Sequence, residues 1–259
     1  MKKLLFACSL LVAALSAKAS VWESTQKWDK EWEARYGRWI ARDVSKDIFV
    51  DGKTLLSGMA TDCADSLYAV RILFAYENNL PFVINAPGYF EGKIQTFGNS
   101  TSMFDHIKDE KERVKAFIKF VMEQSGTDSL QKDTYPVAIN SINAGTLYLV
   151  EWWYVLKLKM VQHSFFVKGA NAKNGLIYLS SNAPVKVRKL DVTKGVPRFE
   201  FAKAPFGYRS WKHPEHLLIP ESSIPKELGY STEQYDIVNQ YGERAGLKEI
   251  NKRIKKRFK

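Results

Sequence analysis

The feature that most constrains the fold is a change in hydrophobic periodicity near Gly126. Before it, apolar residues recur at the three- and four-residue spacing of buried helix faces; after it, β-branched and aromatic residues dominate. Helices followed by strands are typical of an α+β fold, with helices on one face of an antiparallel sheet. The pattern predicts helices over 24–44, 62–78 and 105–124, strands over 146–150, 154–168, 176–180 and 185–190, and two further helices after residue 230.

The first nineteen residues have the pattern of a cleavable export signal. Met1-Lys2-Lys3 is basic, an apolar run too short to span a bilayer follows, and Ala17-Lys18-Ala19 is a small-x-small cleavage sequence. Cleavage after Ala19 predicts a secreted or periplasmic protein. Cys8 weakly resembles a lipoprotein acylation site, but cleavage before it would leave almost no apolar segment, so we expect no lipid anchor.

The charge of the chain predicts an anionic partner. The formal net charge is +11, and loss of Lys2, Lys3 and Lys18 with the signal leaves +8. Peptidoglycan, another anionic envelope polymer or anionic lipid fits this charge, and export argues against nucleic acid as a partner. The tail 251–259 is dense in Lys and Arg, so it is either a solvated helix face or a contact with an anionic polymer or membrane surface. The oligomeric state is left open.

Cys63 is the one cysteine left after the signal is removed, so it has no disulfide partner within the chain. In an oxidising compartment a lone thiol indicates an intermolecular disulfide, an inert buried side chain or a reactive group. Cys63 lies at the start of a predicted helix that Thr61 or Asp62 can cap. A helix N-terminus lowers a thiol pKa, whereas Asp62 and Asp65 oppose this effect. We favour a nucleophilic thiol, with free backbone N–H groups ready to bind an oxyanion.

His163 is the candidate general base, because it lies on a predicted strand just before a hairpin at Asn174-Gly175. Asn182, or Ser180 as its competitor, would orient the imidazole. In an ideal two-residue hairpin, His163 lies opposite Lys186, and Asn182 is about 13 Å away along the strand. A bulge or a longer loop is therefore required for the contact.

Short motifs in the chain resemble papain-like cysteine hydrolases. Asp62-Cys63-Ala64-Asp65 resembles the Asp-Cys-Ser-Gly motif of NlpC-type cell-wall peptidases, and residues 142–147 resemble their entry into the strand before the histidine. His163 with the following hairpin and Ser180-Ser181-Asn182 resembles the histidine hairpin of CHAP amidases. The resemblance covers islands between residues 61 and 182 and implies a papain-like core with Cys63 as nucleophile, His163 as base and Asn182 or Ser180 as the orienting residue.

Several departures separate the chain from that pattern. Ala64-Asp65 replaces Ser-Gly, Gln162 replaces the usual Gly before the histidine, and the gap between the cysteine and the histidine is long, which implies an insertion within 87–131. The exit of the helix that starts at Cys63, Asn78-Asn79-Leu80-Pro81, resembles that of transglutaminase-like enzymes, which share the architecture.

These observations predict four segments. They are a signal peptide at 1–19, an N-terminal helical extension at 20–55, a papain-like cysteine hydrolase domain at 56–195, and a C-terminal extension with a basic tail at 196–259. The predicted function is cysteine-dependent hydrolysis of cell-wall peptides. The alternatives are transglutaminase-like acyl transfer and non-catalytic binding to the envelope by a protein that keeps the fold.

Two further patterns are interpreted as structural. Four aromatic residues at helical spacing, Trp28, Trp32, Tyr36 and Trp39, favour packing on the main domain over a sugar-stacking surface. The segment 212–216, Lys-His-Pro-Glu-His, has a spacing that can hold a metal, but a proline interrupts it and no third ligand is evident. We therefore predict neither a metal nor a cofactor.

Overall fold

The computed structural model describes residues 20–90, 92–154, 159–197 and 204–258, so the predicted signal peptide lies outside the described residues. The helices are α1 (Lys30–Arg42), α2 (Cys63–Glu77), α3 (Glu110–Gln124), α4 (Thr127–Asp133), α5 (Glu233–Tyr241) and α6 (Glu243–Lys256). The strands are β1 (Val83–Asn85), β2 (Thr96–Gly98), β3 (Thr134–Pro136), β4 (Leu147–Tyr154), β5 (Lys159–Asn171), β6 (Gly175–Ser180), β7 (Asp191–Lys194) and β8 (Gly207–Trp211). Short 3₁₀ turns are η1 (Gly88–Phe90), η2 (Ile139–Ser141), η4 (Pro214–His216), η5 (Glu221–Ser223) and η6 (Lys226–Leu228).

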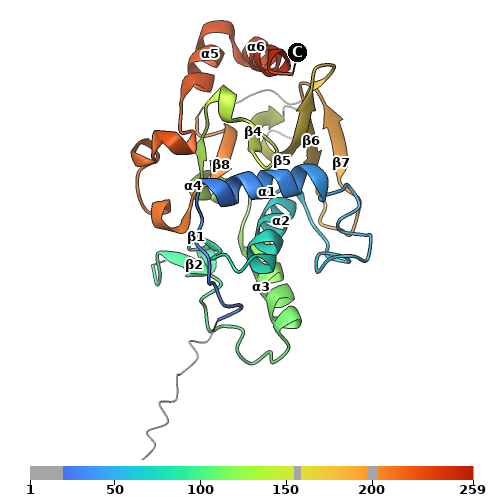
Figure 1. Ribbon diagram of the computed structural model, residues 1–259, viewed down its shortest axis with the longest axis vertical. Helices are drawn as coiled ribbons and strands as arrows, with labels where there is room; N and C mark the ends of the chain where they lie inside the picture. The colour runs from blue at the N-terminus through green and yellow to red at the C-terminus, as the bar shows by residue number, and fades with distance from the viewer. Residues whose placement is uncertain (1–19, 91, 155–158, 198–203, 259) are drawn as a thin grey trace, which may run out of the picture.

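A six-stranded antiparallel sheet with the order β3-β8-β4-β5-β6-β7 forms the centre of the molecule, so the predicted α+β class is confirmed. Figure 1 shows α2 and α3 on one side of this sheet and α5 and α6 on the other. The prediction that helices cover one face is therefore wrong. The late amphipathic segments do not extend away from the domain but cover the second apolar face of the sheet.

Alternation along β4 and β5 divides the core into two layers. Leu149 and Phe166 belong to the layer that contains α2 and α3, whereas Val150 and Phe165 belong to the layer under α5 and α6. Successive side chains of a strand point to opposite faces, so both faces of these strands are apolar. Each polar residue of β4 or β5 therefore faces one of these two apolar layers, according to its position in the alternation.

The helix α2 begins at Cys63 because Asp62 caps it. The Asp62 carboxylate accepts hydrogen bonds from the backbone N–H groups of Ala64 and Asp65, at 3.0 and 3.2 Å, and the Asp65 carboxylate accepts one from the Asp62 N–H. Every residue from 63 to 75 is buried. The expected amphipathic helix is therefore a central helix enclosed on all sides, and its apolar stripe is only part of its buried surface.

The aromatic stripe of α1 packs on α2, as the sequence predicted. Trp28, Trp32, Tyr36 and Trp39 all place their rings within 6.3 Å of the Phe74 ring, centroid to centroid. The helix is shorter than predicted and starts at Lys30, because the Asp29 carboxylate accepts a hydrogen bond from the Trp32 N–H and so caps it there.

The C-terminal segment 196–259 supplies a strand of the central sheet. β8 lies between β3 and β4, and its Arg209 is fully buried, where Nε donates a 2.8 Å hydrogen bond to the Thr134 hydroxyl of β3. On the other edge, the strand expected at 185–190 is replaced by β7, and Lys186 makes only an isolated bridge with Thr61. The edges of the sheet are therefore β3 and β7, and β8 from the C-terminal segment is an interior strand.

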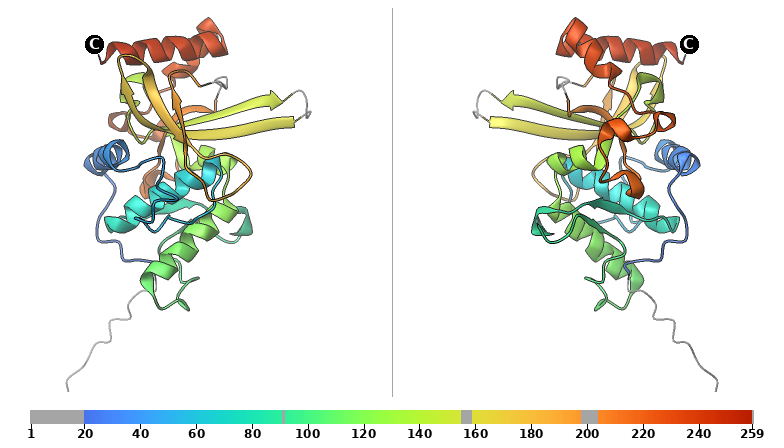
Figure 2. Two further views of the ribbon diagram at one scale, coloured as in Figure 1. Left: turned by 90° about the vertical axis from the view of Figure 1, so that its right-hand side faces the viewer. Right: turned by 90° about the vertical axis from the view of Figure 1, so that its left-hand side faces the viewer.

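β4 and the first half of β5 form a two-stranded arm that extends beyond the rest of the sheet (Figure 2). In β5 the pairing with β6 runs only from Phe166 to Asn171 and contains a register shift between Val167 and Gly169. The three residues 172–174 connect the two strands, where a two-residue loop was expected. The register next to His163 thus differs from that of the ideal hairpin.

The close approach of α1 to the loop before β4 yields a stability prediction. A Cβ on Gly37 would lie 2.8 Å from the backbone oxygen of Ala144. We expect Gly37→Ala to destabilise the protein by about 1–3 kcal/mol, because a backbone atom must move. At a helix position without this contact the same change would stabilise by up to about 1 kcal/mol.

Urea unfolding of Gly37→Ala measures the sign of this effect directly. Gly88→Ala is the matched control, because a Cβ at Gly88 meets nothing within 4 Å. A Gly37→Ala variant as stable as the wild type would contradict the described packing of α1.

Candidate functional site

The Cys63 thiol is enclosed between α2, α4 and β5. Cys63 is 9% exposed, and its Sγ lies 3.8 Å from the Thr127 hydroxyl oxygen. Ser164 of β5 is the other polar neighbour, and its proximity acts to lower the pKa of the thiol, although its hydroxyl has no hydrogen-bond partner among the described residues. Among the described residues, the thiol therefore contacts two hydroxyl groups and no imidazole, with the Asp62 carboxylate nearby.

His163 points to the opposite face of the sheet from Cys63. It pairs with Val150 across β4 and β5, and its ring packs edge-to-face on Phe165 with centroids 4.4 Å apart. Both neighbours belong to the layer under α5 and α6. Because side chains alternate along a strand, the residue that faces the thiol is Ser164, so the structure does not form the expected Cys63–His163 contact.

Asn182 is not placed to orient His163 either. A contact between Asn182 and His163 required a bulge or a longer loop, and β5 has a register shift between Val167 and Gly169. However, the pairing of β5 with β6 ends at Phe166 and Leu179, before it reaches either residue. Asn182 then leaves the sheet, and its side-chain amide donates a hydrogen bond to the Asp191 carboxylate. Its competitor Ser180 is buried and pairs with Asp191 on β7. The three predicted catalytic residues therefore lie in three separate environments.

The electrostatics of the two central groups oppose catalysis by a thiolate–imidazolium pair. Burial, with a smaller contribution from the Asp62 carboxylate, raises the pKa of the Cys63 thiol above its usual value. Burial lowers the pKa of His163 to about 4. At neutral pH the sulfur is therefore a thiol and the imidazole is neutral, which is the state expected of two buried core residues.

A surface groove with arginine and tryptophan walls lies where α1 packs on the end of α2. It has a volume of about 400 Å³, and its lining is Trp32, Arg35, Arg38, Trp39, Arg42, Phe74, Glu77 and Asn78. Three arginines project from exposed positions of α1, while the two tryptophans are half-buried. The Arg35 guanidinium stacks over the Trp32 ring at 4.6 Å. Arg35 and Arg42 form ion pairs with Glu31 and Asp43, so the groove offers a ligand mainly its tryptophan faces and the Arg38 guanidinium.

The second cationic surface is the outer side of α6, which contains most of the predicted basic tail. Residues 243–258 hold seven Lys or Arg and two Glu, and the inward side of the helix packs Leu247, Ile250 and Ile254 against the sheet. Because these apolar side chains are buried in the domain, they cannot enter a membrane. The exposed side of α6 carries charge without aromatic rings, apart from Phe258 just beyond the helix end.

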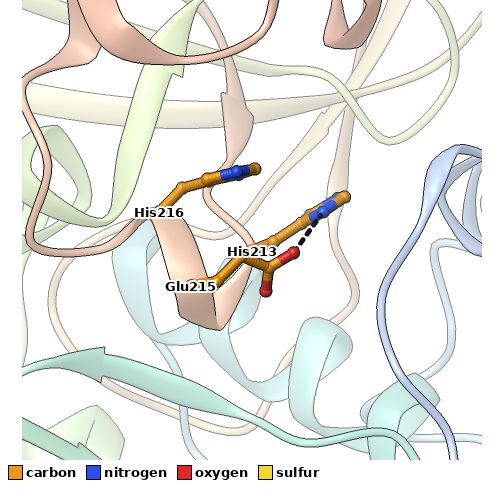
Figure 3. Close-up of side chains that lie close together, drawn as sticks. All are labelled: His213, Glu215 and His216. Carbon is orange, nitrogen blue, oxygen red and sulfur yellow. Dashed lines mark ion pairs between the residues drawn. The ribbon is translucent and has the colours of Figure 1, made fainter.

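The structure also gathers a His–Glu–His cluster that was not expected to act together. His213, Glu215 and His216, in and beside η4, place one ligand atom each within 4.8 Å of the others (Figure 3). Glu215 is the third ligand that the sequence seemed to lack. The signal was present in the spacing of the segment, but the intervening proline obscured it, because a 3₁₀ turn accepts Pro214 at its first position.

Comparisons with known proteins add no functional assignment. No family model matches the chain, and neither curated proteins nor solved structures give a significant match. No helix among the described residues combines the length and the apolar character needed to cross a bilayer. The chemistry of the sites is therefore inferred from their own residues.

The buried position of His163 predicts a specific pH dependence of stability. Its folded pKa of about 4 lies below the ordinary value of 6.5, so the unfolded chain binds more protons between these values. Stability therefore falls as pH falls. Relative to His163→Gln, the wild type should lose about 2 kcal/mol of unfolding free energy between pH 7 and pH 5.

Urea unfolding of both proteins at each pH isolates this contribution, because other titrating groups cancel in the difference. Equal pH dependence in the two proteins would show that His163 is solvated, as a catalytic imidazole at a cleft would be.

The environment of Cys63 predicts an unreactive thiol. We expect iodoacetamide to modify the native protein at least about tenfold more slowly than the urea-unfolded chain, with no reactive plateau below the free-thiol pKa of about 8.5. His163→Gln should leave the rate unchanged, because the imidazole is on the other face of the sheet. An acid-side plateau that disappears in His163→Gln would instead establish an activated pair.

Proposed function

We propose that this protein is a non-catalytic binding protein of the cell envelope that holds an anionic, sugar-containing polymer in the groove of α1. The observation that carries the proposal is the separation of Cys63 from His163 by the central sheet, with Ser164 facing the thiol. A protein that retains the helix-on-sheet arrangement without a base next to its thiol is better suited to binding than to hydrolysis.

The chemistry of the groove supports a polymer of sugars and acidic groups. Flat aromatic faces pack on the apolar faces of sugar rings, and guanidinium groups bind carboxylates or phosphates with two parallel hydrogen bonds. Trp39 and Arg38 line the groove together, from adjacent positions of α1. Peptidoglycan, with its glycan strand and acidic stem peptides, is the polymer that we favour, because the amino-terminal sequence predicts export.

Cysteine-dependent amide hydrolysis is the second candidate, supported by one observation. Cys63 stands at the capped N-terminus of α2, beside Ser164 of β5. His163, the expected base, is the residue that precedes Ser164 on this strand. On this basis a papain-like core is part of the proposal. Transglutaminase-like acyl transfer would require the same thiol and the same missing base.

The binding proposal predicts which surface variants lose the polymer. In co-sedimentation of the mature protein with purified peptidoglycan, Trp39→Ala and Arg38→Ala should each weaken binding by roughly tenfold, the size expected for a central aromatic or arginine contact. Cys63→Ser should bind as the wild type does. Binding should also weaken as salt is raised, because part of the attraction is ionic.

Arg244→Ala on α6 is the matched control, since it removes the same charge at an exposed position outside the groove. It should change binding less than twofold at about 0.15 M salt. If Arg244→Ala lost as much binding as Arg38→Ala, the polymer would contact α6 or would be attracted by the net charge alone, and the groove proposal would be wrong. Release of soluble peptides by the wild type but not by Cys63→Ser would replace this proposal with hydrolysis.

A further inference from the structure

The cluster at the end of β8 has the composition of a transition-metal site. Two imidazoles and one carboxylate meet at η4, and Figure 3 shows the rings of His213 and His216 nearly parallel, with Glu215 beside His213. The ring centroids are 5.7 Å apart, and Glu215 Oε1 lies 3.6 Å from His213 Nδ1. His213 is 3% exposed, which is unusual for an imidazole with no structural role.

Both nitrogens of the His213 ring face carboxylate oxygens. Nδ1 faces Glu215, and Nε2 lies 3.3 Å from Glu33 Oε1 on α1, within ion-pair distance although the contact does not have hydrogen-bond geometry. A neutral imidazole has one N–H, so only one of these contacts can be a hydrogen bond. With the proton on Nε2, the lone pair of Nδ1 and the Glu215 carboxylate are two acceptors that can bind the same cation.

The Glu33 carboxylate is fixed in the position that would orient a metal-bound histidine. Arg71 donates to both of its oxygens, one at 3.1 Å, and the Trp28 ring stacks on His213 with centroids 6.4 Å apart. Metal-binding histidines usually donate their other ring N–H to a carboxylate, which sets the tautomer and the ring orientation. Here that outer carboxylate comes from a helix more than 170 residues away in the sequence.

His216 provides an independent observation. Its Nδ1 is buried, and it has no hydrogen-bond partner among the residues that the structure describes. A buried polar atom without a hydrogen-bond partner costs free energy unless a bound water or ion satisfies it. The cluster is small enough for one ion to do so.

From these contacts we propose that His213, Glu215 and His216 bind one divalent metal ion of the zinc class. Two nitrogens and one carboxylate oxygen are a ligand set that zinc accepts, and bonds of about 2.0–2.2 Å place tetrahedral ligands about 3.3 Å apart. The ligand atoms lie within 4.8 Å of one another, and Glu215 Oε1 is already 3.6 Å from His213 Nδ1. The two rings are stacked with centroids 5.7 Å apart, so metal binding requires rotation of the half-buried His216 ring, which brings its lone pair toward the ion.

The rival explanation is a proton. A doubly protonated His213 would bridge Glu33 and Glu215 as an imidazolium, with no use for His216. Metal titration separates the two, since the imidazolium does not bind a cation and the metal site needs all three residues.

The experiment is a titration of the metal-free, tag-free mature protein with Co²⁺, followed by its visible absorption, and then displacement by Zn²⁺. We expect one Co²⁺ per chain with the intense bands of a four-coordinate site. Glu215→Gln and His216→Ala should each weaken Co²⁺ binding at least about tenfold, and Glu33→Gln should weaken it about 10–100-fold through His213.

His106→Ala is the matched control, because this histidine is exposed and distant from η4 in the sequence. It should bind as the wild type does. Glu215 and His216 are exposed and half-buried, so their variants should fold, which circular dichroism checks. Absence of saturable binding below about 1 mM Co²⁺, or an equal loss in His106→Ala, would overturn the proposal.

Discussion

The ion pair between Arg71 and Glu33 is the interaction on which the surrounding structure depends. Arg71 comes from the central helix α2, is 3% exposed, and lies 3.5 Å above the Trp28 ring. Burial is the largest single influence and raises the pKa of Glu33, but the charge and hydrogen bonds of Arg71, together with the contact with His213, outweigh it and hold that pKa below its usual value. Removing one partner of such a buried pair typically costs about 3–5 kcal/mol, because the other charge is left unpaired.

This pair joins parts of the chain that are far apart in the sequence. Through Glu33 it fixes α1, and α1 carries the arginines and tryptophans of the surface groove. Through the same carboxylate it contacts His213, at the turn that follows β8. The groove and the His213–Glu215–His216 cluster therefore share one buried support.

The pleat of β5 decides what the cysteine can do. Cys63 is at a capped helix start, a position that usually lowers a thiol pKa. However, the strand beside it presents Ser164, while His163 is turned into the apolar layer under α5 and α6. A difference of one residue in a strand moves a side chain to the other face of the sheet. Burial then dominates, so the thiol stays protonated and the imidazole stays neutral.

The sequence by itself determined the local structure and the α+β class. Helix periodicity and the Asp62 cap located α2 to within a residue, and the aromatic stripe predicted the packing of α1, because these signals depend on neighbouring residues. Only the tertiary structure decided that α6 covers the second face of the sheet, that His163 turns away from Cys63, and that Glu33 meets His213. Those outcomes depend on strand register and on contacts between distant segments, which no local spacing encodes.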